Sequence, residues 1–74
     1  NPMTTIEFNM KKAGIAKMDV FDINGRLIST LFDGYKQEGR QFVKFSGYDM
    51  PSGVYFYRFT ANGFADTKKM MIVK

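Results

Sequence analysis

The sequence predicts an all-β protein in which two antiparallel sheets pack face to face. No window keeps the i, i+3, i+4, i+7 apolar spacing of an amphipathic helix for more than one turn. Short runs of alternating apolar and polar residues recur instead, separated by glycine-containing turn signals. Short strands at such spacing favour a sandwich of six or seven strands, of which the immunoglobulin-like form is the commonest.

The first two predicted strands lie at residues 4–9 and 15–22. In the first, Ile6 and Phe8 alternate with polar residues, as in a strand with one buried face. The segment Lys11-Lys12-Ala13-Gly14 interrupts this pattern. The second strand then resumes it, with three apolar residues on one face: Ala16, Met18 and Val20.

Asn24-Gly25 predicts a tight turn after the second strand, because these two residues tolerate positive φ. A two-residue turn would place apolar side chains opposite one another in both arms. The facing pairs would be Ile23 with Arg26, Phe21 with Ile28, and Met18 with Leu31.

Two further loops are expected in the middle of the chain. Asp33-Gly34 and Glu38-Gly39 bracket a short connection, after which residues 40–45 form a strand with Val43 and Phe45 on one side. Residues 46–53 are so rich in turn formers that they predict the longest irregular connection.

The closing residues predict a β-hairpin with a type I′ turn at Asn62-Gly63. That turn sets its register: Tyr57 opposite Lys68, Tyr55 opposite Met70, and Arg58 opposite Thr67. We assign three aromatic side chains of its first arm to the core, namely Tyr55, Tyr57 and Phe59.

Length and composition indicate one domain that depends on apolar packing. The 74 residues include no cysteine and no histidine, so disulfides and the usual zinc and thiol chemistry are absent. Eight Phe and four Tyr supply the packing. A Gly-x-Ser-x-Gly elbow is also missing, so we expect neither an enzyme nor a bound cofactor.

The aspartates are interpreted as turn and strand-end residues. Asp22-Ile23-Asn24-Gly25 is similar to the opening of a calcium loop, but its twelfth position would be Asp33, and strand-forming residues intervene. An ordinary hairpin turn is therefore the favoured interpretation. Asp19, likewise, is expected to be structural rather than catalytic.

A formal charge of +4 permits an acidic partner, but the basic residues are dispersed. Tyr55, Tyr57, Arg58, Lys68 and Lys69 would combine aromatic platforms with cations, as single-stranded nucleic acid requires. The favoured interpretation places these aromatics in the core and the lysines on an edge strand, where lysine opposes aggregation. We therefore expect no nucleic-acid partner.

No apolar run approaches the roughly 18 to 20 residues of a membrane-spanning helix, so no direct membrane insertion is expected. The opening Asn1-Pro2 is not a natural translation start. Residues 1–74 are therefore expected to form a single domain, the end of a larger exported protein.

Four segments together resemble the C-terminal sorting domain (type A) of cargo proteins of the type IX secretion system. Asn1-Pro2-Met3-Thr4-Thr5-Ile6-Glu7-Phe8 is similar to the family's opening strand, and Val20-Phe21-Asp22-Ile23-Asn24-Gly25-Arg26 to its Tyr-Asp-x-x-Gly-Arg turn, with Phe21 where Tyr is commoner. The others are Pro51-Ser52-Gly53-Val54-Tyr55-Phe56-Tyr57-Arg58 and residues 67–74.

The resemblance implies a seven-stranded immunoglobulin-like domain that directs its cargo to the cell surface or the medium. The cargo would cross the periplasm, and the domain would engage outer-membrane translocation and attachment machinery. Its partners would be that machinery and the upstream cargo domain of the same chain.

Carried over residue by residue, the resemblance places sorting-signal recognition in the last two strands. The terminal segment, residues 68–74, is the strongest candidate: main-chain pairing at an exposed edge would give affinity and alternate side chains selectivity. The full candidate set is Pro51, Gly53, Val54, Tyr55, Tyr57, Gly63, Lys68, Lys69 and Lys74.

Two alternatives remain open from the sequence. One is a structural accessory module like the related immunoglobulin-like domain of the flagellar hook-cap protein, which lies inside its protein, so the residue that follows Lys74 in the gene would discriminate. The other is a carbohydrate-binding appendage, which would display a planar aromatic row built from Tyr35, Tyr48 and Phe64.

Overall fold

The computed structural model describes residues 3–73, which contain six β-strands and no helix. Gly14 opens the second strand, and the chain reverses at short connections of which residues 47–52 are the longest, as predicted. The strands are β1 (Met3–Met10), β2 (Gly14–Phe21), β3 (Leu27–Lys36), β4 (Gly39–Ser46), β5 (Gly53–Ala61) and β6 (Phe64–Ile72).

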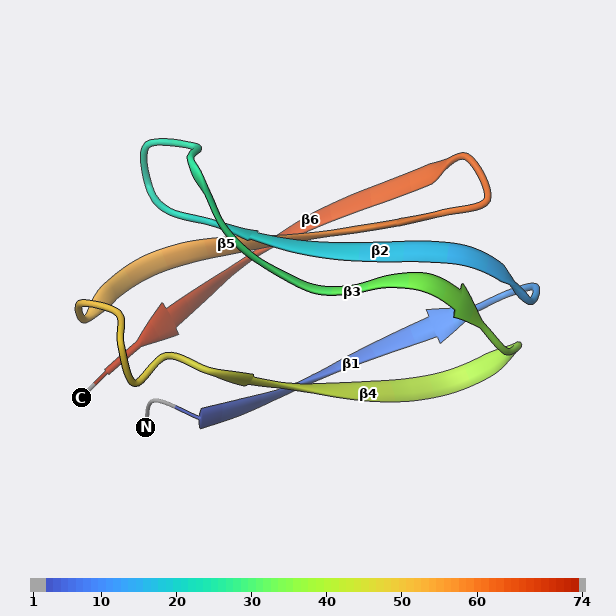
Figure 1. Cartoon of the computed structure of the whole chain (residues 1–74), viewed down its shortest axis with the longest axis horizontal. Helices are drawn as coiled ribbons and strands as arrows, with labels where there is room; N and C mark the ends of the chain where they lie inside the picture. Colours follow the sequence, from blue (N-terminus) through green and yellow to red (C-terminus); the bar gives the residue numbers. More distant parts are fainter. Residues whose placement is uncertain (1–2, 74) are drawn as a thin grey trace.

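The strands form two antiparallel sheets of unequal size. β1 pairs with β4 in a two-stranded sheet, and the other strands form a four-stranded sheet in the order β3-β2-β5-β6. Figure 1 shows β1 and β4 together as one layer beneath the larger sheet. The predicted all-β two-sheet sandwich is therefore confirmed, with six strands.

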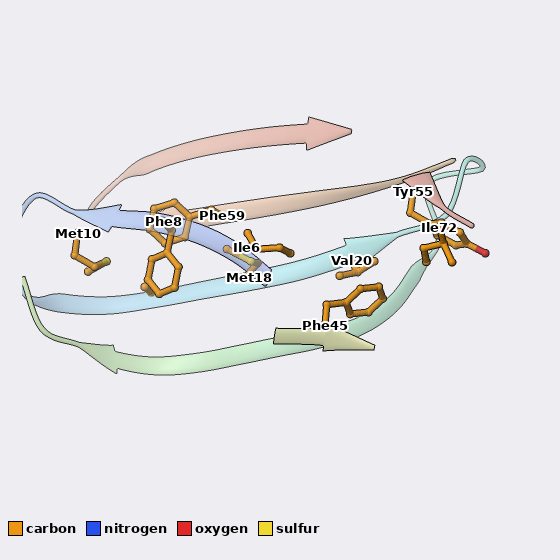
Figure 2. Close-up of a cluster of buried hydrophobic side chains, with 10 residues drawn as sticks. Ile6, Phe8, Met10, Met18, Val20, Phe45, Tyr55, Phe59 and Ile72 are labelled. Atoms are coloured by element: carbon orange, nitrogen blue, oxygen red, sulfur yellow. The ribbon is translucent and has the colours of Figure 1, made fainter. Parts of the chain in front are cut away.

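The core lies where the two sheets overlap, and its centre is aromatic. The Phe8 ring of β1 stacks on Phe32 of β3 with centroids 4.9 Å apart and meets Phe59 of β5 at 5.2 Å. Such offset and tilted pairs add to the apolar burial itself. The buried apolar residues, most of them labelled in Figure 2, are Ile6, Phe8, Met10, Ala16, Met18, Val20, Phe45, Tyr55, Phe59 and Ile72.

The β2–β3 turn differs from the predicted two-residue turn. Gly25 donates its amide to the Asp22 carbonyl at 3.0 Å, and Asp22 donates to the Arg26 carbonyl at 3.0 Å, so three residues form the loop. Gly25 adopts φ 81°, which closes a type I turn with a left-handed residue. The sequence Asp-x-x-Gly selects this turn because the Asp22 carboxylate organises it.

Asp22 uses both carboxylate oxygens within the turn. Oδ1 accepts the Asn24 amide at 2.9 Å and the Arg26 amide at 3.0 Å, while Oδ2 pairs with Arg26 Nε at 3.2 Å. This is an Asx turn extended by an ion pair. These oxygens satisfy the backbone of their own turn, as the hairpin interpretation of this segment requires.

The predicted register of β2 and β3 is wrong at both ends. Phe21 faces Leu27 because the three-residue loop shifts the pairing by one residue. A bulge between Val20 and Phe21 restores the predicted register at Val20–Ser29 and Asp19–Thr30. A second bulge, between Met18 and Asp19, then places Met18 opposite Phe32. The ladder skips Ile28 and Leu31, the residues predicted to face Phe21 and Met18. A bulge inserts an extra residue in one strand, and no single-strand pattern reveals it.

The connection predicted between Asp33-Gly34 and Glu38-Gly39 is shorter than expected, because β3 continues through Asp33 and Gly34 to Lys36. Lys17 faces Asp33 and Ala16 faces Gly34 in the ladder. Pairing with β2 therefore outweighs the local turn preference, and the loop shrinks to residues 37 and 38.

The closing hairpin matches its prediction in turn type and register. Asn62 and Gly63 adopt φ 52° and 78°, as a type I′ turn requires. In the ladder Tyr55 faces Met70, Tyr57 faces Lys68 and Arg58 faces Thr67. Tyr55 and Phe59 are buried and Tyr57 is half-buried, so the core assignment holds with Tyr57 at its margin.

The Asp22 turn predicts a stability difference that depends on pH. Hydrogen bonding from the Arg26 amide lowers the pKa of Asp22 below its ordinary value of 3.8, helped by the Asn24 amide and the Arg26 guanidinium and opposed by desolvation. The ionised form therefore stabilises the fold at neutral pH, and this stabilisation is lost as the pH falls through the folded pKa. Asp22→Asn should be less stable than the parent at pH 7.

Urea unfolding at pH 7 and pH 3 measures this difference, and the gap between Asp22→Asn and the parent should narrow at pH 3. Glu38→Gln is the matched control, since it removes one carboxylate from the exposed β3–β4 connection. It should change the free energy of unfolding by less than about 0.5 kcal/mol at either pH. If the stability difference between Asp22→Asn and the parent were larger at pH 3 than at pH 7, the stabilising role of the ionised Asp22 carboxylate would be contradicted.

Candidate recognition surface

The terminal segment lies on β6, which is an edge strand of the larger sheet. β6 pairs with β5 on one side, and no other strand of the described residues pairs with its outer side. In Figure 1, β6 runs diagonally from the turn at the upper right to the C-terminal end at the lower left. Lys68, Lys69, Met71 and Val73 are exposed, whereas Met70 is half-buried and Ile72 is buried. Lys74 lies outside the described residues.

The two lysines of the terminal segment lie on opposite faces of the sheet. Lys68 is paired with Tyr57, on the face that carries the core, whereas Lys69 is paired with Phe56, on the outer face. Neither has an ion-pair partner in the described part of the chain. A flat partner on one face would reach only one of them, so a partner that reads both must approach the β6 edge.

Pro51 and Tyr55 are joined by a hydrogen bond at the start of β5. The Tyr55 hydroxyl donates to the Pro51 carbonyl at 2.7 Å, and the Tyr55 ring is only 7% exposed. The arrangement is similar to a tyrosine corner, in which a buried tyrosine ties a strand to the loop before it. It closes the loop of residues 47–52 against the beginning of β5.

The remaining candidates of the hairpin occupy turn and packing positions. Gly53 has φ 151° and Gly63 φ 78°, in regions that other residues rarely adopt. Val54 and Tyr57 are half-buried, and Val54 faces Met71 of the terminal segment. These residues shape the hairpin that carries the terminal segment. Most of the exposed residues of this hairpin belong to β6.

Sequence reasoning missed the contact that anchors the end of β6. Ile72 is 3% exposed, and its side chain fills the space next to Gly47, which is itself buried. A Cβ placed on Gly47 would lie 2.8 Å from Ile72 Cδ1 and 3.2 Å from Cγ2. Gly47 sits among turn formers, so its sequence context indicates only a loop.

The aromatic residues of the carbohydrate alternative are exposed but do not form one row. Tyr48 belongs to the loop before β5, whereas Phe64 follows the turn at the other end of that strand. Nine residues of β5, about 30 Å of strand, separate these two ends. Tyr35 faces Ile15 in a different part of the larger sheet.

Residues 3–73 lack the features of two other kinds of site. They include no helix that would be long and apolar enough to span a bilayer. Nowhere in this range do three or more His, Cys, Asp or Glu side chains gather in a way that would hold a metal ion. The distinctive surface of the described chain is therefore the edge formed by β6.

Comparison with known proteins identifies one family. The family model for the secretion system C-terminal sorting domain matches residues 1–74. No curated protein and no solved structure matches the chain. The match includes the Asp22 turn as well as both strands of the closing hairpin.

Filling the space at Gly47 should loosen the end of β6. Gly47→Val would crowd Ile72, and overpacking of this kind costs about 1–3 kcal/mol. The φ of Gly47 is not positive, so the effect would report packing rather than backbone strain. Urea unfolding should show the loss of stability, and hydrogen exchange should show faster exchange in residues 70–72.

Gly34→Val is the matched control for this prediction. A Cβ on Gly34 meets no atom within 4 Å, and the residue lies in an extended strand where valine is favoured. Its stability should stay within about 0.5 kcal/mol of the parent. If both valine variants were equally stable, the packing of Ile72 would not require a residue without a side chain at position 47.

Proposed function

The chain belongs to the family of secretion system C-terminal sorting domains and is a type IX sorting signal; from this premise we propose that the exposed edge of β6 is the part that the secretion machinery reads. A sorting domain is handled by that machinery as part of a cargo chain, which is exported to the cell surface or medium. The observation that carries the proposal is the position of residues 68–72 on an edge strand, where Lys68, Lys69 and Met71 are exposed.

Strand addition is the mode of recognition that this geometry supports best. An edge strand presents unpaired N–H and C=O groups, and a partner strand gains affinity by pairing with them. Lys68 and Lys69 project to opposite faces of the same edge. A partner strand would therefore meet one cation on each face, which gives selectivity for a paired basic edge.

The other residues of the candidate set hold this edge in place. Pro51 and Tyr55 fix the start of β5 through their hydrogen bond, and Gly53 and Gly63 allow the backbone to turn into and out of that strand. Val54 and Tyr57 lie beside the terminal segment in β5, opposite Met71 and Lys68. Recognition itself is proposed for Lys68, Lys69 and Lys74.

We further propose the place of the domain in its protein and in the cell. Residues 1–74 would form the single domain at the end of a larger exported protein. The cargo would pass through the periplasm, and the domain would then engage outer-membrane translocation and attachment machinery. Nothing in this route requires a catalytic or cofactor site in the domain itself.

Reversing the charge of the β6 edge should impair export. A reporter protein carrying residues 1–74 at its C-terminus would be expressed in a bacterium that has a type IX secretion system. The parent fusion should reach the surface or medium, whereas the double variant Lys68→Glu, Lys69→Glu should lose most of this delivery and accumulate inside the cell. Fractionation and immunoblotting measure the distribution.

Lys44→Glu is the control, because Lys44 is an exposed lysine of β4, on the smaller sheet. This variant should be exported like the parent. Circular dichroism and thermal melting of the purified domains must show that all variants remain folded. Normal export of a folded double variant would disprove recognition through these two lysines.

A further inference from the structure

A groove lies between the free edge of β1 and the face of β6 that points toward the smaller sheet. β1 lies over β2, since its Phe8 ring contacts Phe32 of β3 and Phe59 of β5, the strands on either side of β2. The smaller sheet therefore stops before it reaches β6. The resulting space, here called the β1–β6 groove, has a volume of about 670 Å³.

One wall of the groove is a strand edge. β1 pairs with β4 on one side, and no strand of residues 3–73 pairs with its other side. Residues 4–9 of β1 line the groove along nearly the whole strand. In an antiparallel pair, every second residue points its N–H and C=O away from the partner, so this wall offers main-chain hydrogen bonds to an added strand.

The floor of the groove is the uncovered face of the closing hairpin. Side chains of β6 alternate, so Phe64, Asp66, Lys68 and Met70 all lie on the face that carries Tyr55 and Phe59. Phe64 is 55% exposed, and Met70 is only half-buried. A strand added to β1 would extend the smaller sheet over these side chains and cover the apolar ones.

The charges around the groove favour an acidic occupant. Three lysines line it, Lys11, Lys68 and Lys69, and none has an ion-pair partner in the described chain. Of the two acidic residues that line it, Glu7 is paired with Arg40 at 3.7 Å, which leaves Asp66. Complementary charge selects the partner and its orientation at such a site.

A second copy of the domain does not fit this edge. Antiparallel pairing of two β1 strands requires a two-fold axis perpendicular to the smaller sheet, so both larger sheets would lie on the same side. The larger sheet extends beyond β1 by β5 and β6, which would then collide with their symmetry mates. The groove therefore admits a lone strand but not the two-fold pairing of two domains through β1.

We propose that the β1–β6 groove binds an extended, acidic and apolar segment of a partner protein, which pairs with the free edge of β1 as an additional strand. Its apolar side chains face Phe64 and Met70, and its carboxylates face Lys11 and Lys68. The Lys69 side chain lies on the outer face of the larger sheet and does not take part. This surface shares Lys68 with the proposed β6 recognition edge, but its strand-pairing edge belongs to β1. It does not rest on the sorting function proposed above.

The test uses octapeptides tethered through a short Gly-Ser linker to the N-terminus of the domain, where tethering raises the effective concentration to the millimolar range. Two acidic peptides alternate Val and Glu in the two possible phases, and two basic ones replace Glu with Lys. Hydrogen exchange is then measured residue by residue. At least one acidic peptide should slow exchange of alternate β1 amides at least ten-fold, and the basic peptides should have a weaker effect.

Free peptides and variants identify the role of charge. The better acidic peptide should bind the domain about five-fold more tightly than its basic counterpart, as two partly exposed ion pairs allow. Lys68→Glu should remove this preference, whereas Lys44→Glu, on the outer face of the smaller sheet, should keep it. Unchanged β1 exchange with all four tethered peptides, or protection of β3, β4 or the outer β6 edge instead, would overturn the proposal.

Discussion

A two-stranded sheet cannot cover a four-stranded one, and most features of this domain follow from that mismatch. Burial falls across the larger sheet with distance from the overlap. Met18 and Val20 of β2 are completely buried, β5 contributes Tyr55 and Phe59, and β6 contributes only Ile72. The core therefore holds β6, the strand proposed to carry the terminal signal, through a single fully buried residue.

The terminal strand is instead held by its hairpin and by one anchor. The type I′ turn at Asn62-Gly63 starts the β5–β6 ladder, and Ile72 ends it by packing against Gly47. Full burial of one such side chain is worth about 1.5–3 kcal/mol, which is small beside the contribution of the central aromatic cluster. An element with so few buried contacts opens locally at low cost. Such an edge is easier for a partner to pair with than a central strand would be.

The parts of the fold that the sequence predicted correctly are those governed by local chemistry. Asn62-Gly63 permits essentially one turn, and that turn sets the register of every later pair in the hairpin. Asn24-Gly25 resembles it, yet Asp22 accepts two amides and selects a three-residue loop instead. The bulges in β3, the extension of β3 through Gly34 and the Gly47–Ile72 contact depend on partners distant in the chain, so no local pattern indicates them.

The same mismatch explains how the domain can expose strand edges without pairing with other copies through all of them. Free edges promote aggregation, and proteins protect them with lysines, bulges or steric cover. β6 has exposed lysines, and β3 has two bulges. The β1 edge is protected differently, because the overhanging β5 and β6 block two-fold pairing of two domains through β1. An edge protected by overhang alone remains open to a lone strand, so the overhang that opposes β1–β1 pairing also defines what kind of partner can bind.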